Sequence, residues 1–201
     1  MAYSDFTLSE MTHRFLLSID EKSDLFSSVP EIALRPEFMS VLEELVPLAL
    51  SVSTEKARSE LIIAPILLEL WRITGQSIGF FSGIEFSVDK EEGLTGICDF
   101  ILTRSSRQLY VEAPVFMLTE AKNEDMKRGY AQCIAEMIAA QRFNAREGYG
   151  KDKVYGAVTI GERWKFLELE GAVARIDSED YYLEHIHKIM GILLHLTTSN
   201  R

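Results

Sequence analysis

Three charged side chains stand within or beside strongly apolar runs in the middle of the chain. Asp99 lies inside GICDFIL, and Glu120 and Lys122 close VFMLTEAK. Charged side chains rarely enter strand interiors unless a specific interaction holds them there. Residues i and i+2 of a strand point to the same face, about 6.6 Å apart, so Glu120 and Lys122 should project together. The spacing predicts a site that contains a carboxylate and an ammonium group.

A second carboxylate would extend this predicted site. If the segment TRSSRQ turns the chain back, Asp99 lies beside Glu120. Two like charges about 4 Å apart repel by roughly 4 kcal/mol at an effective dielectric constant of 20. A hard divalent cation, Mg²⁺ or Mn²⁺, would relieve that repulsion, polarise a phosphoryl oxygen and lower the pKa of a bound water. Lys122 could then orient the water or stabilise transition-state charge, which predicts metal-dependent phosphodiester chemistry.

Composition predicts an ordinary globular protein. The chain has 201 residues, of which 47% are hydrophobic and 26% charged, and this suits a single domain. No apolar run approaches the roughly 20 residues of a membrane helix, and the start, MAYSDFTL, has no basic head before an apolar stretch. We therefore expect no membrane association and a cytoplasmic location. The two cysteines, Cys98 and Cys133, lie in apolar segments and should be small buried hydrophobes.

Charge is distributed unevenly along the chain. The net charge of −10 argues against a protein whose whole surface binds nucleic acid. Residues 1–98 carry 7 basic and 16 acidic side chains, whereas residues 99–165 carry 11 basic and 9 acidic side chains. The middle third is the least acidic part and contains the charged motif, which permits a local surface that faces phosphate.

Helical and strand-like periodicities alternate along the chain. They predict an α/β (α+β) fold with a mixed central β-sheet flanked by helices and with extra N-terminal helices. Residues 1–201 should form one domain, with an N-terminal helical extension at 1–52, a core at 53–160 and a strand plus C-terminal helix at 161–201. Pro65 should bend the helix that contains it. The predicted helices are 4–19, 36–50, 54–74, 123–148 and 178–198, and the predicted strands are 77–88, 95–104, 107–113, 115–122, 153–161 and 163–171.

The order of charged residues and elements resembles the PD-(D/E)XK, or restriction-endonuclease-like, nuclease superfamily. The resemblance covers roughly residues 53–160, and the strings GICDF and LTEAKNED are also similar to a group of mostly uncharacterised cyanobacterial proteins of this class. It implies a helix with a glutamate, a strand with the metal-binding Asp, a strand that ends in (D/E)xK, and a following helix. Cys98 stands before the aspartate where many members have proline.

The resemblance also implies a role for each matching residue. Asp99 and Glu120 would hold Mg²⁺ or Mn²⁺, with Glu60 on the 54–74 helix assisting through water. Lys122 would position the nucleophile, and Gln132 on the following helix would support the site. The substrate would be DNA. A homodimer would allow both strands of a duplex to be cut, although no sequence feature requires one.

Two assignments have competitors in the sequence. Glu55 lies on the same predicted helix as Glu60, about 140° round, so the two should not both face the site. Glu60 is preferred because it lies deeper in the apolar part, whereas Glu55 suits the first turn of a helix. A second acid-x-lysine triplet, Asp20-Glu21-Lys22, follows what should be a helix end and has no acid-bearing strand before it.

Two other interpretations stay open. The chain could be a non-catalytic binding or regulatory module that keeps the fold, which the acidic net charge favours. It could also be an unrelated α/β interaction protein in which Glu120 and Lys122 form a structural ion pair. Gln132 would then belong to a solvated polar stripe with Arg128 and Glu136, since all three share one helix face.

Overall fold

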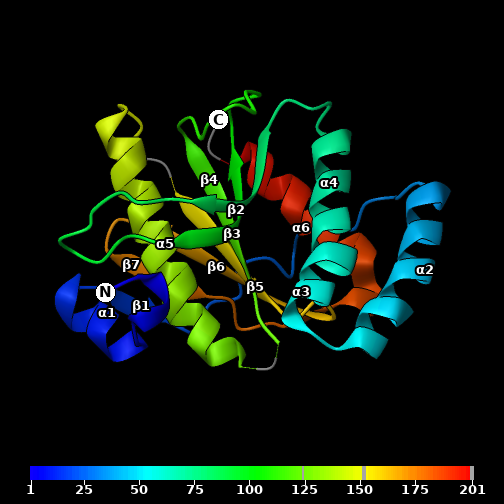
Figure 1. Ribbon diagram of the computed structural model, residues 1–201, viewed down its shortest axis with the longest axis horizontal. Coiled ribbons are helices and arrows are strands. Elements are labelled where there is room, and N and C mark those ends of the chain that lie inside the picture. The colour runs from blue at the N-terminus through cyan, green and yellow to red at the C-terminus, as the bar shows by residue number, and fades with distance from the viewer. Residues whose placement is uncertain (124, 151–152, 200–201) are drawn as a thin grey trace.

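The computed structural model describes residues 1–123, 125–150 and 153–199. In this part of the chain an open, mixed sheet of eight strands carries helices on both faces (Figure 1), so the predicted mixed sheet flanked by helices is confirmed. The two-residue strand β8 (Tyr181–Tyr182) pairs with β6 beside the main path. The main path runs β1 (Ser18–Asp20), β7 (Val173–Ile176), β6 (Arg163–Glu170), β5 (Val154–Thr159), β4 (Val115–Ala121), β3 (Ile97–Thr103) and β2 (Gly79–Glu85).

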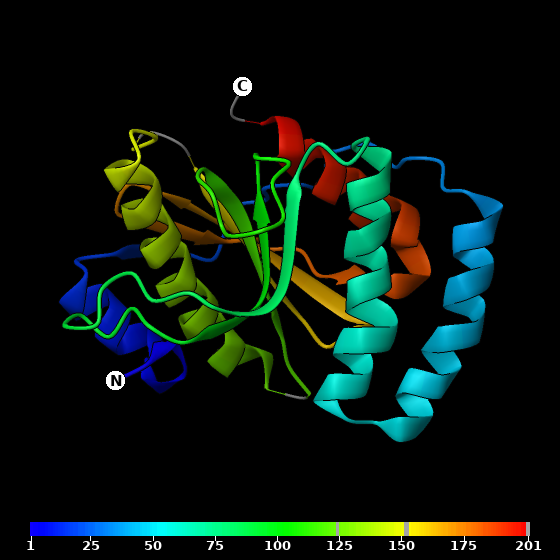
Figure 2. The same ribbon diagram turned by 45° about the horizontal axis from the view of Figure 1, so that its top comes forward.

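Helices cover the sheet in two layers, which Figure 2 shows on opposite sides of the strands. Apolar side chains from each layer pack against their own face of the sheet. One layer contains α2 (Pro36–Val52), α3 (Glu55–Arg58), α4 (Ala64–Ile73) and α6 (Ile186–Thr198). The other contains α1 (Leu8–Arg14) and α5 (Met126–Arg146).

Strand β4 occupies the middle of the sheet and leads into α5. All seven of its residues are buried, as expected for a strand covered by helices on both faces. It pairs antiparallel with β3 and parallel with β5, so α5 is the crossover between two neighbouring parallel strands. The helix begins after Asp125, whose side chain accepts a hydrogen bond from the backbone N–H of Arg128 at 3.2 Å. The end of β4 and the start of α5 therefore lie close together.

The helix predicted at 54–74 is present, but one of its turns is wider than an α-helical turn. Thr54 caps the start by accepting from the backbone N–H of Ala57 at 3.1 Å. Ser59–Ile63 form a π-helical turn, in which the N–H of Ala64 bonds to the carbonyl of Ser59. Pro65 has no N–H, and its ring crowds the carbonyl of the preceding turn. The wider turn gives that carbonyl room, so the helix accommodates Pro65 by a π turn.

Several predicted elements are wrong at the ends of the chain and in one loop. The predicted helix 4–19 is a 3-10 turn at Tyr3–Asp5, then α1, then strand β1, which pairs parallel with β7. Residues 107–113 form no strand. The helix predicted at 178–198 begins as β8 and a 3-10 turn at Leu183–His185. The N-terminal segment therefore contributes a strand to the sheet, and the C-terminal segment contributes three.

Other expectations agree with the described residues. Cys98 and Cys133 are buried and unbridged, as predicted. The strands predicted at 153–161 and 163–171 are present and form the antiparallel pair β5 and β6. No described helix combines the length and apolarity needed to cross a bilayer.

Candidate functional site

At the point where the β3–β4 ladder ends, the side chain of Asp99 takes the place of a backbone hydrogen-bond acceptor. The last paired residues there are Phe100 and Thr119. Beyond them, Oδ2 of Asp99 accepts a hydrogen bond from the backbone N–H of Ala121 at 2.8 Å. The carboxylate is thereby fixed beside the residue that separates Glu120 from Lys122. The predicted proximity of Asp99 to the Glu120–Lys122 pair is present in the structure.

Glu120, Lys122, Gln132 and Glu136 form a continuous set of side-chain hydrogen bonds between β4 and α5. Lys122 Nζ donates to Oε1 of Glu120 and, at 3.1 Å, to Oε1 of Gln132. Gln132 Nε2 in turn donates to Oε1 of Glu136 at 3.2 Å. The carboxyl groups of Glu136 and Glu120 lie close enough for each to act on the pKa of the other. The four side chains therefore form a connected cluster, which we call the β4–α5 ring.

The close approach of α5 to β4 depends on Gly129. A Cβ atom on this residue would lie 2.6 Å from Cγ1 of Val158 and 3.1 Å from Cγ of Lys122. The first distance is shorter than real Cβ contacts, so a larger residue would push the helix away from the sheet. Gly129 thus lets the start of α5 pack on the Lys122 stem, and Gln132 follows one turn later.

Burial governs the ionisation of the carboxyl groups in this ring. Glu120 is 2% exposed and Glu136 is 0% exposed. Burial, followed by the charge of Asp99, raises the pKa of Glu120 to about 7, although Lys122 opposes this shift. Burial and the nearby Glu120 raise the pKa of Glu136 well above its ordinary value. Since two neighbouring carboxylates repel each other, each of these groups favours the protonated form of the other.

Asp99 and Lys122 are less deeply buried than Glu120 and Glu136, and opposing effects act on their pKa values. Burial raises the pKa of Asp99, while its bond from Ala121 and the charge of Lys122 lower it. For Lys122, burial lowers the pKa, but the carboxylates of Glu120, Glu55 and Asp99 together outweigh burial and raise it. Lys122 therefore stays an ammonium group and faces acceptors only.

A cavity of about 230 Å³ opens beside Asp99 and reaches the helix that precedes the sheet. Both Glu55 and Glu60 line it, so the expectation that only one of them could face this region is wrong. The reason is that the cavity borders the first turns of the helix on more than one face, since Lys56 and Ser59 line it as well. Gly83, which lies across the β2–β3 pair from Asp99, adopts φ +61° and also lines the cavity.

The two candidate helix acids have different surroundings. Glu60 forms an ion pair with Lys56 at 2.9 Å, and its side chain is 59% exposed. Glu55 is also exposed, but its charge is the one that acts on the pKa values of Asp99 and Lys122. The assignment of Glu60 stays a prediction, with Glu55 as a competitor of comparable standing.

Sequence reasoning assigned no role to Glu136. Only the alternative interpretation placed it, on a solvated stripe with Arg128 and Gln132, whereas Glu136 is fully buried. The signal was present in the run CIAEMIAA, where the acid is the lone charge among apolar residues that the structure buries. A charged residue in such a run faces a core or a site.

The donor set of the site suits a hard cation. All candidate ligands supply oxygen, which Mg²⁺ and Mn²⁺ prefer. Oε2 of Glu120 is buried and accepts from no N–H or O–H group within the described chain, a cost that a cation would remove. Among those same residues, no three His, Cys, Asp or Glu side chains are already spaced to hold a metal. The residues fit the cation by donor type, and a third acid would have to move toward Asp99 and Glu120.

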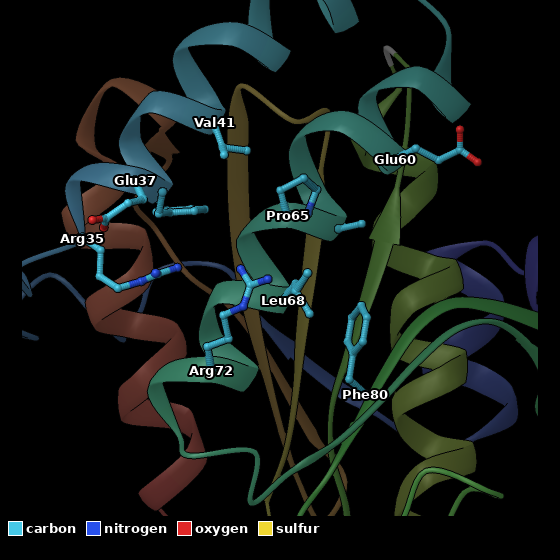
Figure 3. Close-up of a pocket in the computed structure, with 10 residues that line it drawn as sticks. Arg35, Glu37, Val41, Glu60, Pro65, Leu68, Arg72 and Phe80 are labelled. Carbon is cyan, nitrogen blue, oxygen red and sulfur yellow. The ribbon is translucent and has the colours of Figure 1, made fainter.

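A separate groove of about 580 Å³ lies between α2 and α4 (Figure 3). Figure 3 shows Glu60 at one end of it, directed away from the groove, and Arg35 and Arg72 at the other. Both arginines bind Glu69, which is 0% exposed: Arg35 at 2.7 and 2.8 Å and Arg72 at 3.6 Å. The hydrogen bonds from Arg35 hold the pKa of Glu69 below its ordinary value. This ion cluster ties the start of α2 to α4.

No protein-family model matches this chain, and no curated protein matches it significantly. The interpretation of the site therefore depends on its residues and their geometry.

Proposed function

We propose that this chain is a metal-dependent phosphodiesterase that hydrolyses DNA. The observation that carries the proposal is the convergence of Asp99, Glu120 and Lys122 at the end of two neighbouring strands, beside an open cavity. The helix that lines the cavity, the two acid-bearing strands and the helix with Gln132 follow one another in the order that the nuclease resemblance implies. A cytoplasmic location belongs to the same proposal.

The roles of the acidic residues follow from their donor atoms. Asp99 and Glu120 would hold Mg²⁺ or Mn²⁺, and Glu60 or Glu55 would assist from the helix through water. The bound cation would supply a polarised phosphoryl oxygen and a water of lowered pKa. Glu120 must be ionised to serve as a ligand, so cation binding should strengthen as the pH rises toward and above 7.

Lys122 would act on the attacking water and on charge that develops in the transition state. Its side chain is 16% exposed and its ammonium group is held by Glu120 and Gln132, so its position is defined before substrate arrives. Preorganised donors of this kind need no reorganisation during the reaction.

Exposed cations near the site would face the DNA backbone. Lys127 and Arg128 are exposed in the first turn of α5, about one helical turn before Gln132, which contacts Lys122. Phosphate contacts of this kind position nucleic acid without reading its sequence. A local basic rim agrees with a net charge of −10 because the acids are concentrated in residues 1–98. A homodimer would present two such sites to one duplex.

A plasmid-nicking assay with Mn²⁺ tests the proposal. Wild type should nick or linearise DNA, and Lys122→Ala should lose cleavage while its Mn²⁺ affinity stays within about tenfold, or 1.4 kcal/mol. Lys153→Ala is the matched control, because Lys153 also pairs with a glutamate, Glu168, at 3.1 Å but directly precedes β5, at the end of that strand away from the site. The control should cut as wild type does.

The alternative is a binding module on the same fold, with Glu120 and Lys122 as a structural ion pair. It is favoured by the acidic net charge and by the lack of three preassembled acids within the described residues. In that case Lys122→Ala would strand a buried carboxylate and cost about 3–5 kcal/mol. Wild type inactive on double- and single-stranded DNA, together with that loss of stability, would favour the alternative.

A further inference from the structure

The β4–α5 ring contains one side chain that has no assigned role, and its contacts define one. Glu136 is the most deeply buried member of the ring and lies one helical turn beyond Gln132. It contacts Gln132 and Glu120, the two groups that hold the ammonium of Lys122. A merely structural glutamate would be expected to neutralise a cation, but Glu136 contacts none directly.

The hydrogen-bond direction along the ring is set by what each group can donate. The ammonium of Lys122 can only donate, so Gln132 must present its carbonyl oxygen to it. The Gln132 amide can adopt that orientation stably only if an acceptor lies on the opposite side. Oε1 of Glu136, at 3.2 Å from Nε2, is that acceptor. Without it, the half-buried amide would lose the acceptor that fixes its orientation and could turn over.

The second contact of Glu136 fixes Glu120. Oε1 of Glu120 accepts from Lys122, and the carboxyl of Glu136 faces Glu120 from the α5 side, close enough to act on its pKa. Glu120 is therefore held from two directions, by a lysine of its own strand and by an acid of the facing helix.

We infer that Glu136 is a positioning residue, which orients Lys122 through Gln132 and aligns Glu120 for the reaction. The inference rests on the proposed phosphodiesterase function, and it adds a residue that touches neither DNA nor the reacting atoms. Displacing a group by about 1 Å can lower a rate by on the order of 100-fold, so the effect of Glu136 should appear in kcat. It should leave the KM for DNA unchanged, because the exposed cations that face the backbone are untouched.

Two substitutions separate positioning from packing. Glu136→Gln keeps an acceptor for Gln132 and adds an N–H toward Glu120, so it should retain kcat within about threefold. Glu136→Met has similar length but can make neither bond, and it should lower kcat by on the order of 100-fold at unchanged KM. Gln132→Met breaks the same link from the other side and should reproduce the loss if Glu136→Met folds poorly. Glu69→Met is the matched control, since Glu69 is an equally buried helix glutamate, and it should keep wild-type kcat.

A second readout does not need catalysis. The side-chain NH₂ protons of Gln132 should be resolved and slow to exchange in nuclear magnetic resonance spectra of wild type and Glu136→Gln, and should lose that protection in Glu136→Met. Unchanged protection, or a Glu136→Met kcat within threefold of wild type, would overturn the inference. If wild type cuts no DNA, the proposed function fails and the Gln132 protons alone decide the inference.

Discussion

Two helix glutamates, Glu69 on α4 and Glu136 on α5, are equally buried but have opposite electrostatic surroundings. Glu69 is held by two half-exposed arginines, which lower its pKa and keep it ionised. Glu136 has only an amide and a second carboxyl group as partners, and its pKa is raised. The first arrangement satisfies the charge it buries. The second does not, and this is typical of sites that bind a cation or perform chemistry.

The largest expected effect is a difference in stability between matched substitutions. Glu69→Met removes the partner of Arg35 and Arg72 and should lower the free energy of unfolding by about 2–4 kcal/mol, somewhat less than for a fully buried pair because both arginines reach solvent. Glu136→Met removes an acid that lacks a cation and should be neutral or stabilising by about 1 kcal/mol. Urea denaturation at pH 7.5 with EDTA measures both, and a loss of similar size in the two variants would remove the distinction.

The pH dependence of stability should differ in sign between the two regions. Raised pKa values at Glu120 and Glu136 mean that their contribution is fully present below the ordinary glutamate pKa and is lost as pH rises through about 7. The lowered pKa of Glu69 means that its contribution is present above the ordinary value and is lost as pH falls. Metal-free wild type should therefore become less stable between pH 5 and pH 8.

Urea midpoints at pH 5, 6, 7 and 8 with EDTA test this sign. Glu136→Gln should flatten the decline because it removes one of the two coupled acids, whereas Glu69→Gln should keep the decline. A wild-type midpoint that stays level, or rises, over this range would contradict the account of the ring.

Much of the candidate site could be predicted because it depends on local spacing. The two-residue period of a strand places Glu120 and Lys122 on one face. Asp99 indicated a site because it is a charged residue inside the apolar run GICDFIL. The presence of both Glu55 and Glu60 at the cavity could not be predicted, since the argument assumed that the site lies against one face of the helix, whereas the cavity borders its first turns. Glu136 was missed because a polar residue four positions from Gln132 has the spacing of a solvated stripe.

The missed strands depend on tertiary contacts. The strands β1 and β7 have three and four residues, too few for an alternating pattern of apolar residues to be visible. They pair with each other across more than 150 positions of sequence, and β7 also pairs with β6 across a tight turn. The triplet Asp20-Glu21-Lys22 was misplaced for this reason, because Asp20 is the last residue of strand β1 and no helix ends there. It lacks a following helix, whereas Glu120–Lys122 is followed at once by α5.

A smaller effect should distinguish the exposed cations of the two regions. Arg128→Ala removes one phosphate contact and should raise the KM for DNA by about threefold and reduce the slope of log affinity against log salt by about 1. Arg72→Ala removes a cation of the Glu69 cluster and should leave the slope unchanged. DNA-binding titrations at 50 to 200 mM salt, with Ca²⁺ in place of Mn²⁺, compare the two variants. Equal slopes would remove Arg128 from the proposed DNA surface.

The central claim is that Asp99 and Glu120 form a cation site, whereas Glu69 is satisfied by arginine. The most direct test is the shift in melting temperature on adding millimolar Mn²⁺ at pH 8. Binding to the native state alone adds about 2.7 kcal/mol at 100 times Kd, so wild type and Glu69→Gln should both melt at a higher temperature, and Asp99→Asn should lose the shift. No shift in wild type, or an undiminished shift in Asp99→Asn, would contradict the account.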